Sequence, residues 1–307
     1  MARSWRVLFA GSPEYAVPTL DALLRMPEIE IVGVLTQKPK PHGRGMQEHP
    51  SAVGEFAKAH NLLTLTPNSL RNAEVLALLR ETQADCGVVV AYGKIFPQNI
   101  LEIFPHGWIN AHGSLLPRWR GASPIQHAVL AGDSTTGVTL MRIDAGMDTG
   151  PTFATDRLRI DENETSQTLA SKLSQSSARL IQSELIPYLE GKRPLTPQPG
   201  EGITTAPLIA KGDGVLDFTL PAETLERQIR AYTSWPGSTC TIKGTTIKIL
   251  QASVQPGSTV PGTCILLPNG FGIGTAQALL VPHSLQVVGK KAMSALAFRN
   301  GYPKLFQ

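Results

Sequence analysis

The stretch Arg6–Pro13 has the sequence RVLFAGSP, a short apolar run that ends in a glycine–proline turn. Similar apolar runs follow at Glu30–Thr36 (EIVGVLT) and Cys86–Ala91 (CGVVVA), with helical patterns between them. Apolar runs that alternate with helices indicate a parallel sheet covered by helices on both faces. We therefore expect an α/β fold for this part of the chain, with a doubly wound, mostly parallel, Rossmann-like sheet.

Further elements extend this pattern along the chain. Strands are expected at Gly107–Asn110 and Gly137–Ile143, and helices near Tyr15–Met26, Ala52–Asn61, Ala73–Gln83 and Thr165–Leu189. The stretch Glu190–Pro207 is rich in proline and glycine, which is typical of a linker. Beyond it, a helix near Ala222–Tyr232 precedes short segments rich in Thr, Ile, Val and Gly, a pattern that predicts a small, mainly β, OB-like barrel. We thus expect domains at residues 1–189 and 209–307, joined by a linker at 190–208.

Composition excludes several classes of protein. With 307 residues, 42% of them apolar and 17% charged, the chain is an ordinary globular protein rather than a disordered or fibrous one. The net charge is only +4, but residues 209–307 contain 9 basic and 4 acidic side chains, which favours a polyanionic partner for that half. The three cysteines form no CxxC pair, which argues against a disulfide framework and a zinc site and favours a reducing compartment.

Neither a membrane nor a common nucleotide cofactor is indicated. No apolar run approaches the roughly 20 residues that span a bilayer, and the apolar part of Met1–Tyr15 is too short for a signal peptide. We therefore expect a cytoplasmic protein. The turn at Ala10–Tyr15 has one glycine where a dinucleotide-binding turn needs GxGxxG, and the chain has no phosphate-binding GxxxxGK[ST] motif.

The densest polar cluster is Gly107–Gly121, with the sequence GWINAHGSLLPRWRG. Asn110 and His112 lie two residues apart at the end of an apolar strand, so their side chains share one face of the sheet. Loops after strand ends are also where open α/β sheets bind ligands. An amide donor beside an imidazole could stabilise a developing oxyanion. The alternative is an asparagine that caps the next turn and a structural histidine.

A second cluster, Ile143–Gly150, has the sequence IDAGMDTG. It could be an ordinary Asp/Gly turn between two strands. It could also supply a carboxylate that orients His112 and stabilises its charged form. The residues themselves do not decide between Asp144 and Asp148.

These motifs together resemble the folate-dependent formyltransferases. The matching stretches are Asn110–His112, Ser114–Ile125, Asp144–Gly150, Phe9–Glu14, Gly43–Gly45, Ala91–Gly93, Ser234–Pro236 and Gly289–Ser294. The resemblance extends over nearly the whole chain, and the long SLLPRWRGA form is closest to members that act on methionyl-tRNA. It implies that Asn110, His112 and Asp148 are catalytic. It also implies that the folate-binding segment consists of Ser114, Leu115, Leu116 and Pro117.

The activity implied by this resemblance is formyl transfer from 10-formyltetrahydrofolate to the α-amine of initiator methionyl-tRNA, with no metal. A formyltransferase for amino sugar nucleotides is the nearest alternative, and a non-catalytic tRNA-binding protein is another. The basic second half and the GRG sequence at Gly43–Gly45 favour tRNA. A monomer is expected.

The loop Gln37–Met46 contains two lysines, an arginine and a histidine but no acidic residue. It follows the strand Glu30–Thr36, so it leaves the same edge of the sheet that presents Asn110 and His112. We expect Lys38, Lys40 and Arg44 to contact tRNA there, although an ordinary solvated loop has the same composition. Family members often have further lysines after the GRG sequence, whereas this chain has Met46-Gln47-Glu48, which makes its loop less basic.

Overall fold

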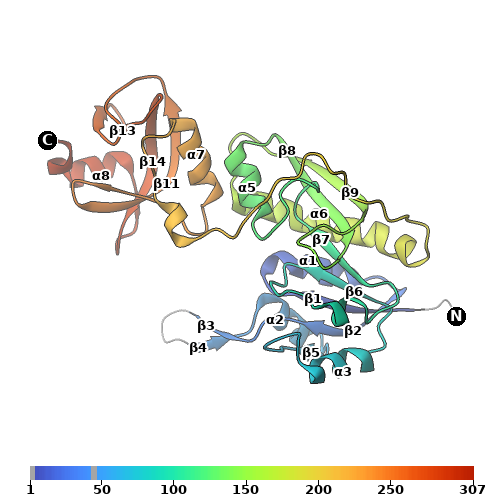
Figure 1. The fold of residues 1–307 in the computed structure, drawn as a ribbon. Coiled ribbons are helices and arrows are strands. Elements are labelled where there is room, and N and C mark those ends of the chain that lie inside the picture. Colours follow the sequence, from blue (N-terminus) through green and yellow to red (C-terminus); the bar gives the residue numbers. More distant parts are fainter. Residues whose placement is uncertain (1–3, 43–46) are drawn as a thin grey trace. The chain divides into compact units, whose positions relative to one another are not determined.

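A seven-stranded sheet forms the first part of the computed structural model, which describes residues 4–42 and 47–307 (Figure 1). The strands, in spatial order, are β5 (Thr64–Leu65), β2 (Ile29–Leu35), β1 (Trp5–Gly11), β6 (Cys86–Val90), β7 (Trp108–His112), β8 (Thr135–Arg142) and β9 (Thr152–Arg159). The ladders from β5 to β7 are parallel, and those that join β7, β8 and β9 are antiparallel. The predicted mostly parallel sheet is therefore confirmed.

Helices cover both faces of this sheet. They are α1 (Val17–Leu24), α2 (Ala52–Ala59), α3 (Ala73–Glu81), α4 (Gln98–Leu101) and α6 (Ser166–Leu189), with a short 3-10 turn, η1 (Glu14–Ala16), before α1. Helix α5 (Pro124–Ala131) follows β7 in the chain. Leu8 and Ala10 of β1 pack in one core with residues of α3 and α4. Val7 and Phe9, which point to the opposite face, are also fully buried. Burial on both faces explains why the central residues of β1, Val7–Ala10, are apolar without alternation.

Several short elements were not predicted. They include α4, α5, β5 and a two-stranded antiparallel ribbon of β3 (Lys40–His42) and β4 (Gln47–His49). Elements this short contain too few residues for a period to stand out. The ribbon also contains proline and charged residues, which are uncommon in β-strands. None of the helices in the described ranges is long and apolar enough to span a bilayer.

The second part of the chain contains a six-stranded antiparallel sheet, which confirms the mainly β second domain. Its strands are β10 (Ser238–Ile242), β11 (Thr245–Gln255), β14 (Leu279–Val287), β13 (Gly270–Gly274) and β12 (Cys264–Leu267), with β15 (Ala292–Ser294) beside β14. Helices α7 (Ala222–Ala231) and α8 (Ala295–Gly301) pack on it, and short 3-10 turns are η2 (Lys211–Gly214) and η3 (Pro303–Phe306).

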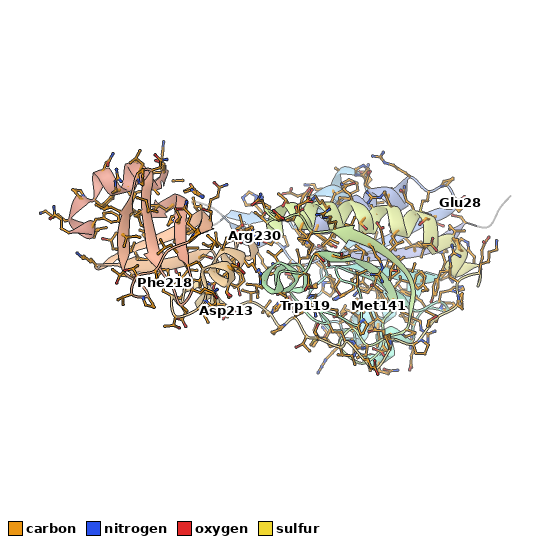
Figure 2. All side chains as sticks on the ribbon, turned by 90° about the horizontal axis from the view of Figure 1, so that it is seen from above. Glu28, Trp119, Met141, Asp213, Phe218 and Arg230 are labelled. Atoms are coloured by element: carbon orange, nitrogen blue, oxygen red, sulfur yellow. The ribbon has the colours of Figure 1, made fainter. Side chains whose placement is uncertain are left out.

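The sheet of the second part encloses a single core. Cys240 of β10 and Cys264 of β12, from opposite ends of the strand order, pack in the same apolar cluster, with Phe218 at its side (Figure 2). The sheet therefore curls around its core, as expected for a barrel-like domain. Burial raises the pKa of Cys240 to about 12 and that of Cys264 to about 11, so both remain thiols at neutral pH.

The chain divides into two compact units. The first comprises residues 1–124, 135–159 and 170–206, and the second comprises 125–134, 160–169 and 207–307. Residues 190–206, where the sequence predicts a linker, are paired with the first unit. Thr196 and Thr152 exchange two backbone hydrogen bonds of 2.8 Å, and Ala206 N–H donates to the Arg120 carbonyl at 2.7 Å. This segment has no regular hydrophobic period, because it is held by its backbone rather than by a buried face.

Candidate active site

Strand β7 presents Asn110 and His112 on one face, as their spacing predicts. Both residues lie in the ladder with β8, where Asn110 faces Met141 and His112 faces Thr139. His112 is the last residue of the strand and is only 6% exposed. The strand therefore fixes the separation and direction of the amide and the imidazole before any loop contributes.

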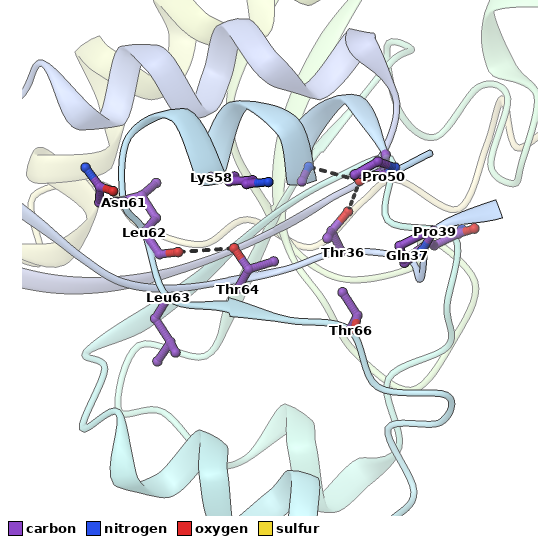
Figure 3. A pocket seen from close by; sticks show the side chains of 12 residues that line it. Thr36, Gln37, Pro39, Pro50, Lys58, Asn61, Leu62, Leu63, Thr64 and Thr66 are labelled. Carbon is purple, nitrogen blue, oxygen red and sulfur yellow. Dashed lines mark hydrogen bonds between the residues drawn. The ribbon is translucent and has the colours of Figure 1, made fainter. Parts of the chain in front are cut away.

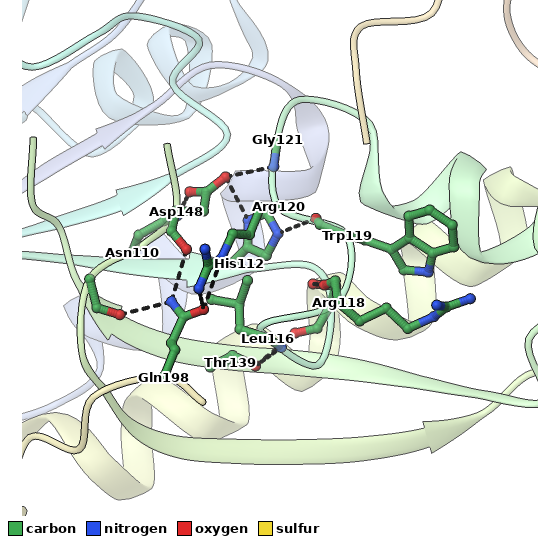
Figure 4. Close-up of polar contacts among 12 residues, drawn as sticks. Asn110, His112, Leu116, Arg118, Trp119, Arg120, Gly121, Thr139, Asp148 and Gln198 are labelled. Atoms are coloured by element: carbon green, nitrogen blue, oxygen red, sulfur yellow. Dashed lines mark hydrogen bonds and ion pairs between the residues drawn. The ribbon is translucent and has the colours of Figure 1, made fainter. Parts of the chain in front are cut away.

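Each ring nitrogen of His112 faces an acceptor. Nε2 lies 2.9 Å from the carbonyl oxygen of Trp119, and Nδ1 lies 3.6 Å from Oδ2 of Asp148 (Figure 4). The bond to a carbonyl oxygen requires a proton on Nε2. The Nδ1 separation is longer than a hydrogen bond.

Asp148 is the acidic residue that the fold brings to His112. Its Oδ1 accepts from Asn110 Nδ2 at 3.4 Å, and its Oδ2 accepts from the backbone N–H of Gly121 at 2.9 Å. Asp144, which the residues alone left as an equal candidate, has its Oδ1 bound within its own turn by Thr149 Oγ1 and Gly146 N–H. The donors of Asn110 and His112 thus converge on Asp148 and not on Asp144.

Sequence reasoning missed Gln198, which lies at this site. Gln198, in the predicted linker, donates from Nε2 to the carbonyl oxygens of Asp148 and Gly150, both at 2.8 Å. Its Oε1 accepts from Arg120 Nε at 3.0 Å and from Arg120 Nη2 at 2.7 Å. Gln198 stands between two prolines, and nothing in that context distinguishes it from an ordinary loop residue.

The segment Ser114–Pro117 is braced from β8. The buried hydroxyl of Thr139 accepts from the backbone N–H of Leu116 at 3.1 Å and donates to the carbonyl of Ser114 at 2.7 Å. Ser114 Oγ donates to the Arg118 carbonyl at 2.5 Å. The segment directly follows β7, so its shape is fixed beside His112.

This brace can be tested with Thr139→Val, which keeps the shape of the side chain but removes its hydroxyl. We expect a loss of about 1–3 kcal/mol in the free energy of unfolding, because a partly buried N–H and a buried carbonyl lose their partner. Urea denaturation measures it. Thr139→Ser keeps the hydroxyl and is the matched control; equal losses in the two variants would contradict the assignment.

Two of the three predicted tRNA-contact residues lie in the described part of the chain. Lys38 and Lys40 follow β2 and are exposed, and Arg44 lies outside the described residues. Gln37 ties this loop to the turn after β6, because its Nε2 donates to the Tyr92 carbonyl at 3.1 Å. The pKa of Lys94, in that turn, is lowered by burial and by the charges of Lys38 and Lys40, so three ammonium groups gather there.

Two clefts flank these elements. One of about 620 Å³ is lined by the turn Asp144–Gly146, by Arg142 and Ile143 of the preceding stretch, and by Leu101 and Phe104. The other, of about 690 Å³, lies beside α2 and includes Thr36, Lys58 and Thr64 (Figure 3). Thr36 and Thr64 already use their hydroxyls within the protein, on Ser51 and on the Leu62 carbonyl. The described residues include no group of three His, Cys, Asp or Glu placed to hold a metal ion.

An open α/β sheet with an amide, an imidazole and a carboxylate at a strand end is typical of a group-transfer enzyme. Comparison with known protein families identifies the family of this chain. Residues 5–185 match the family model for formyl transferase, and residues 208–303 match that for the formyl transferase C-terminal domain. The chain belongs to the formyl transferase family.

Two relatives match nearly the full length of this chain. The chain is 42% identical to the methionyl-tRNA formyltransferase of Myxococcus xanthus, over 97% of this chain and 95% of that protein. It is also 42% identical to that of Thermus thermophilus, over 97% and 96%. Among solved structures, a sugar 3N-formyl transferase with dTDP and 5-N-formyl-THF has a TM-score of 0.68 at 19% identity, covering 94% of this chain and 100% of that one. Methionyl-tRNA formyltransferase from Clostridium thermocellum has a TM-score of 0.54 at 17% identity, covering 82% and 94%.

Proposed function

We propose that this protein transfers the formyl group of 10-formyltetrahydrofolate to the α-amino group of initiator methionyl-tRNA, giving N-formylmethionyl-tRNA. The observation that carries the proposal is the convergence of the Asn110 amide and the His112 imidazole on one carboxylate, at 3.4 and 3.6 Å. The 42% identity to methionyl-tRNA formyltransferases, over 97% of this chain, supports methionyl-tRNA as the acceptor.

Asn110 and His112 stabilise the charge that develops on the formyl oxygen. A neutral amine adds to the formyl carbon, and negative charge grows on the oxygen. The amide of Asn110 has a second hydrogen beyond the one directed to Asp148, and Nε2–H of His112 exchanges the Trp119 carbonyl for the formyl oxygen. Both donors are held by one strand, and donors placed in advance in this way lower the barrier. His112 is buried, so its interaction with the oxygen is weakly screened by water.

Asp148 orients His112 from the side of Nδ1, with Oδ2 at 3.6 Å. The carboxylate also accepts the proton that the attacking amine must lose and passes it to the departing N10 nitrogen. Such proton handling needs a group within reach of both atoms, which the position of Asp148 beside Asn110 and His112 allows.

The folate donor is proposed to lie along Ser114, Leu115, Leu116 and Pro117. This segment directly follows the catalytic strand and is braced by Thr139.

Lys38, Lys40 and Arg44 are proposed to contact the tRNA backbone. For Arg44→Ala we expect a higher KM for tRNA, a larger loss at low salt, and a slope of log Kd against log salt that is about 1 smaller, because one phosphate contact disappears. Filter binding at several salt concentrations measures the slope, with the exposed Arg71→Ala as control. Unchanged tRNA kinetics at low and moderate salt would show that the loop is not a tRNA contact.

A single assay tests the proposed function. The protein is incubated with 10-formyltetrahydrofolate and either charged initiator tRNA or an amino sugar nucleotide. We expect formylation of the methionyl-tRNA only. Formylation of the sugar would favour the alternative that the sugar 3N-formyl transferase fold suggests, and tRNA binding without turnover would favour a binding protein. We also propose that the protein is cytoplasmic and monomeric.

A further inference from the structure

We infer that Gln198, held by Arg120, is a positioning residue for Asp148 in the formyl transfer proposed above. The inference rests on that proposed function. Gln198 is 50 residues beyond Asp148 in the chain and belongs to the segment 190–206. It touches the backbone of the catalytic turn rather than the reacting groups.

The carboxamide of Gln198 is fully used. Both hydrogens of Nε2 go to carbonyl oxygens, those of Asp148 and Gly150, and Oε1 accepts twice from Arg120 (Figure 4). A flipped amide would place Oε1 against two carbonyls and the NH2 group against a guanidinium. Only one orientation therefore satisfies all four contacts, and the side chain acts as a rigid bridge.

The turn that Gln198 holds needs such support. Asp148 has a φ of +52°, a left-handed conformation that residues with a side chain rarely adopt. The outer part of the turn contacts little, and Met147 is 71% exposed. The two carbonyls that Gln198 binds flank Thr149, so they fix the inner end of the turn, from which the Asp148 side chain points to His112.

Arg120 connects this bridge to the rest of the site. Its backbone is paired on both sides with the segment that contains Gln198, through Thr204 and Ala206. The next residue, Gly121, donates its N–H to the Asp148 carboxylate at 2.9 Å. Neighbouring residues of one loop thus hold both the backbone and the carboxylate of Asp148, which sets the distance from Oδ2 to His112.

The first test compares two variants of similar size. Gln198→Glu keeps the pairing with Arg120 but cannot donate to the turn, and Gln198→Met removes both interactions. We expect kcat to fall about 10- to 100-fold in each, because a small displacement of a catalytic group has effects of this size. KM for folate and tRNA should change less than about twofold, since Gln198 contacts neither substrate. Gln167→Glu, on the exposed side of α6, is the matched control.

A double-variant cycle separates positioning from general stability. In an Asp148→Asn background, where the carboxylate is already lost, adding Gln198→Glu should lower kcat by less than about twofold further. A full 10- to 100-fold additional loss would show that Gln198 does not act through Asp148 and would overturn the inference. Equal kcat for wild type and both single variants would overturn it as well.

A second readout needs no substrate. In protein with ¹⁵N-labelled histidine, the ring nitrogen signals of His112 should move in Gln198→Glu and Gln198→Met and stay in place in Gln167→Glu. Unmoved signals would overturn the inference whatever the substrate is. If wild type fails to formylate methionyl-tRNA while the His112 signals move as expected, the proposed function fails and the positioning of Asp148 stands.

Discussion

Replacing His112 by alanine is expected to lower kcat for formyl transfer by about 10²- to 10⁴-fold, because the charge on the formyl oxygen loses a buried donor. Folate affinity should change much less, since the imidazole interacts most strongly with the transition state. Single-turnover formylation of methionyl-tRNA measures the rate, and fluorescence titration measures folate binding.

The matched control is His283→Ala, which removes an exposed histidine of β14. Its rate should equal that of the wild type. Near-wild-type turnover of His112→Ala in a protein that melts at the usual temperature would exclude His112 from the chemistry. The Asn110 amide would then have to stabilise the oxyanion alone.

Replacing Asp148 by asparagine is expected to have an effect of similar size, about 10²- to 10⁴-fold on kcat. The carboxylate serves donors on both oxygens, Asn110 on Oδ1 and Gly121 and His112 on Oδ2. An asparagine has one acceptor oxygen, so its NH2 group must face one of these donors. The variant also loses the negative charge that receives the amine proton.

Asp144→Asn is the control for this change because Asp144 lies in the same turn. Its Oδ1 accepts two hydrogen bonds, which an asparagine oxygen can still accept, so we expect nearly unchanged activity. Measured side by side, the two variants decide which aspartate acts in catalysis. A large loss in Asp144→Asn with little change in Asp148→Asn would reverse the assignment.

The sequence was sufficient for the architecture of the first sheet. Strands such as Cys86–Val90 are buried on both faces, so they must be apolar throughout, and a continuous apolar run is visible without coordinates. It was also sufficient for the shared direction of Asn110 and His112, because alternation along a strand is a local property. The resemblance to formyltransferases added the expected roles of these residues.

The tertiary structure decided which groups meet these side chains. Asp144 and Asp148 are both aspartates of one short turn, so residue type does not distinguish them. The path of the turn, with Asp148 at a φ of +52°, brings Asp148 to His112. Gln198 and Thr139 were not predicted, because each acts through the backbone of a distant segment. Hydrogen bonds from a side chain to a distant backbone leave no periodic pattern in the sequence. Many residue types can donate such a bond, and which residue does so depends on how the loops pack across the sheet.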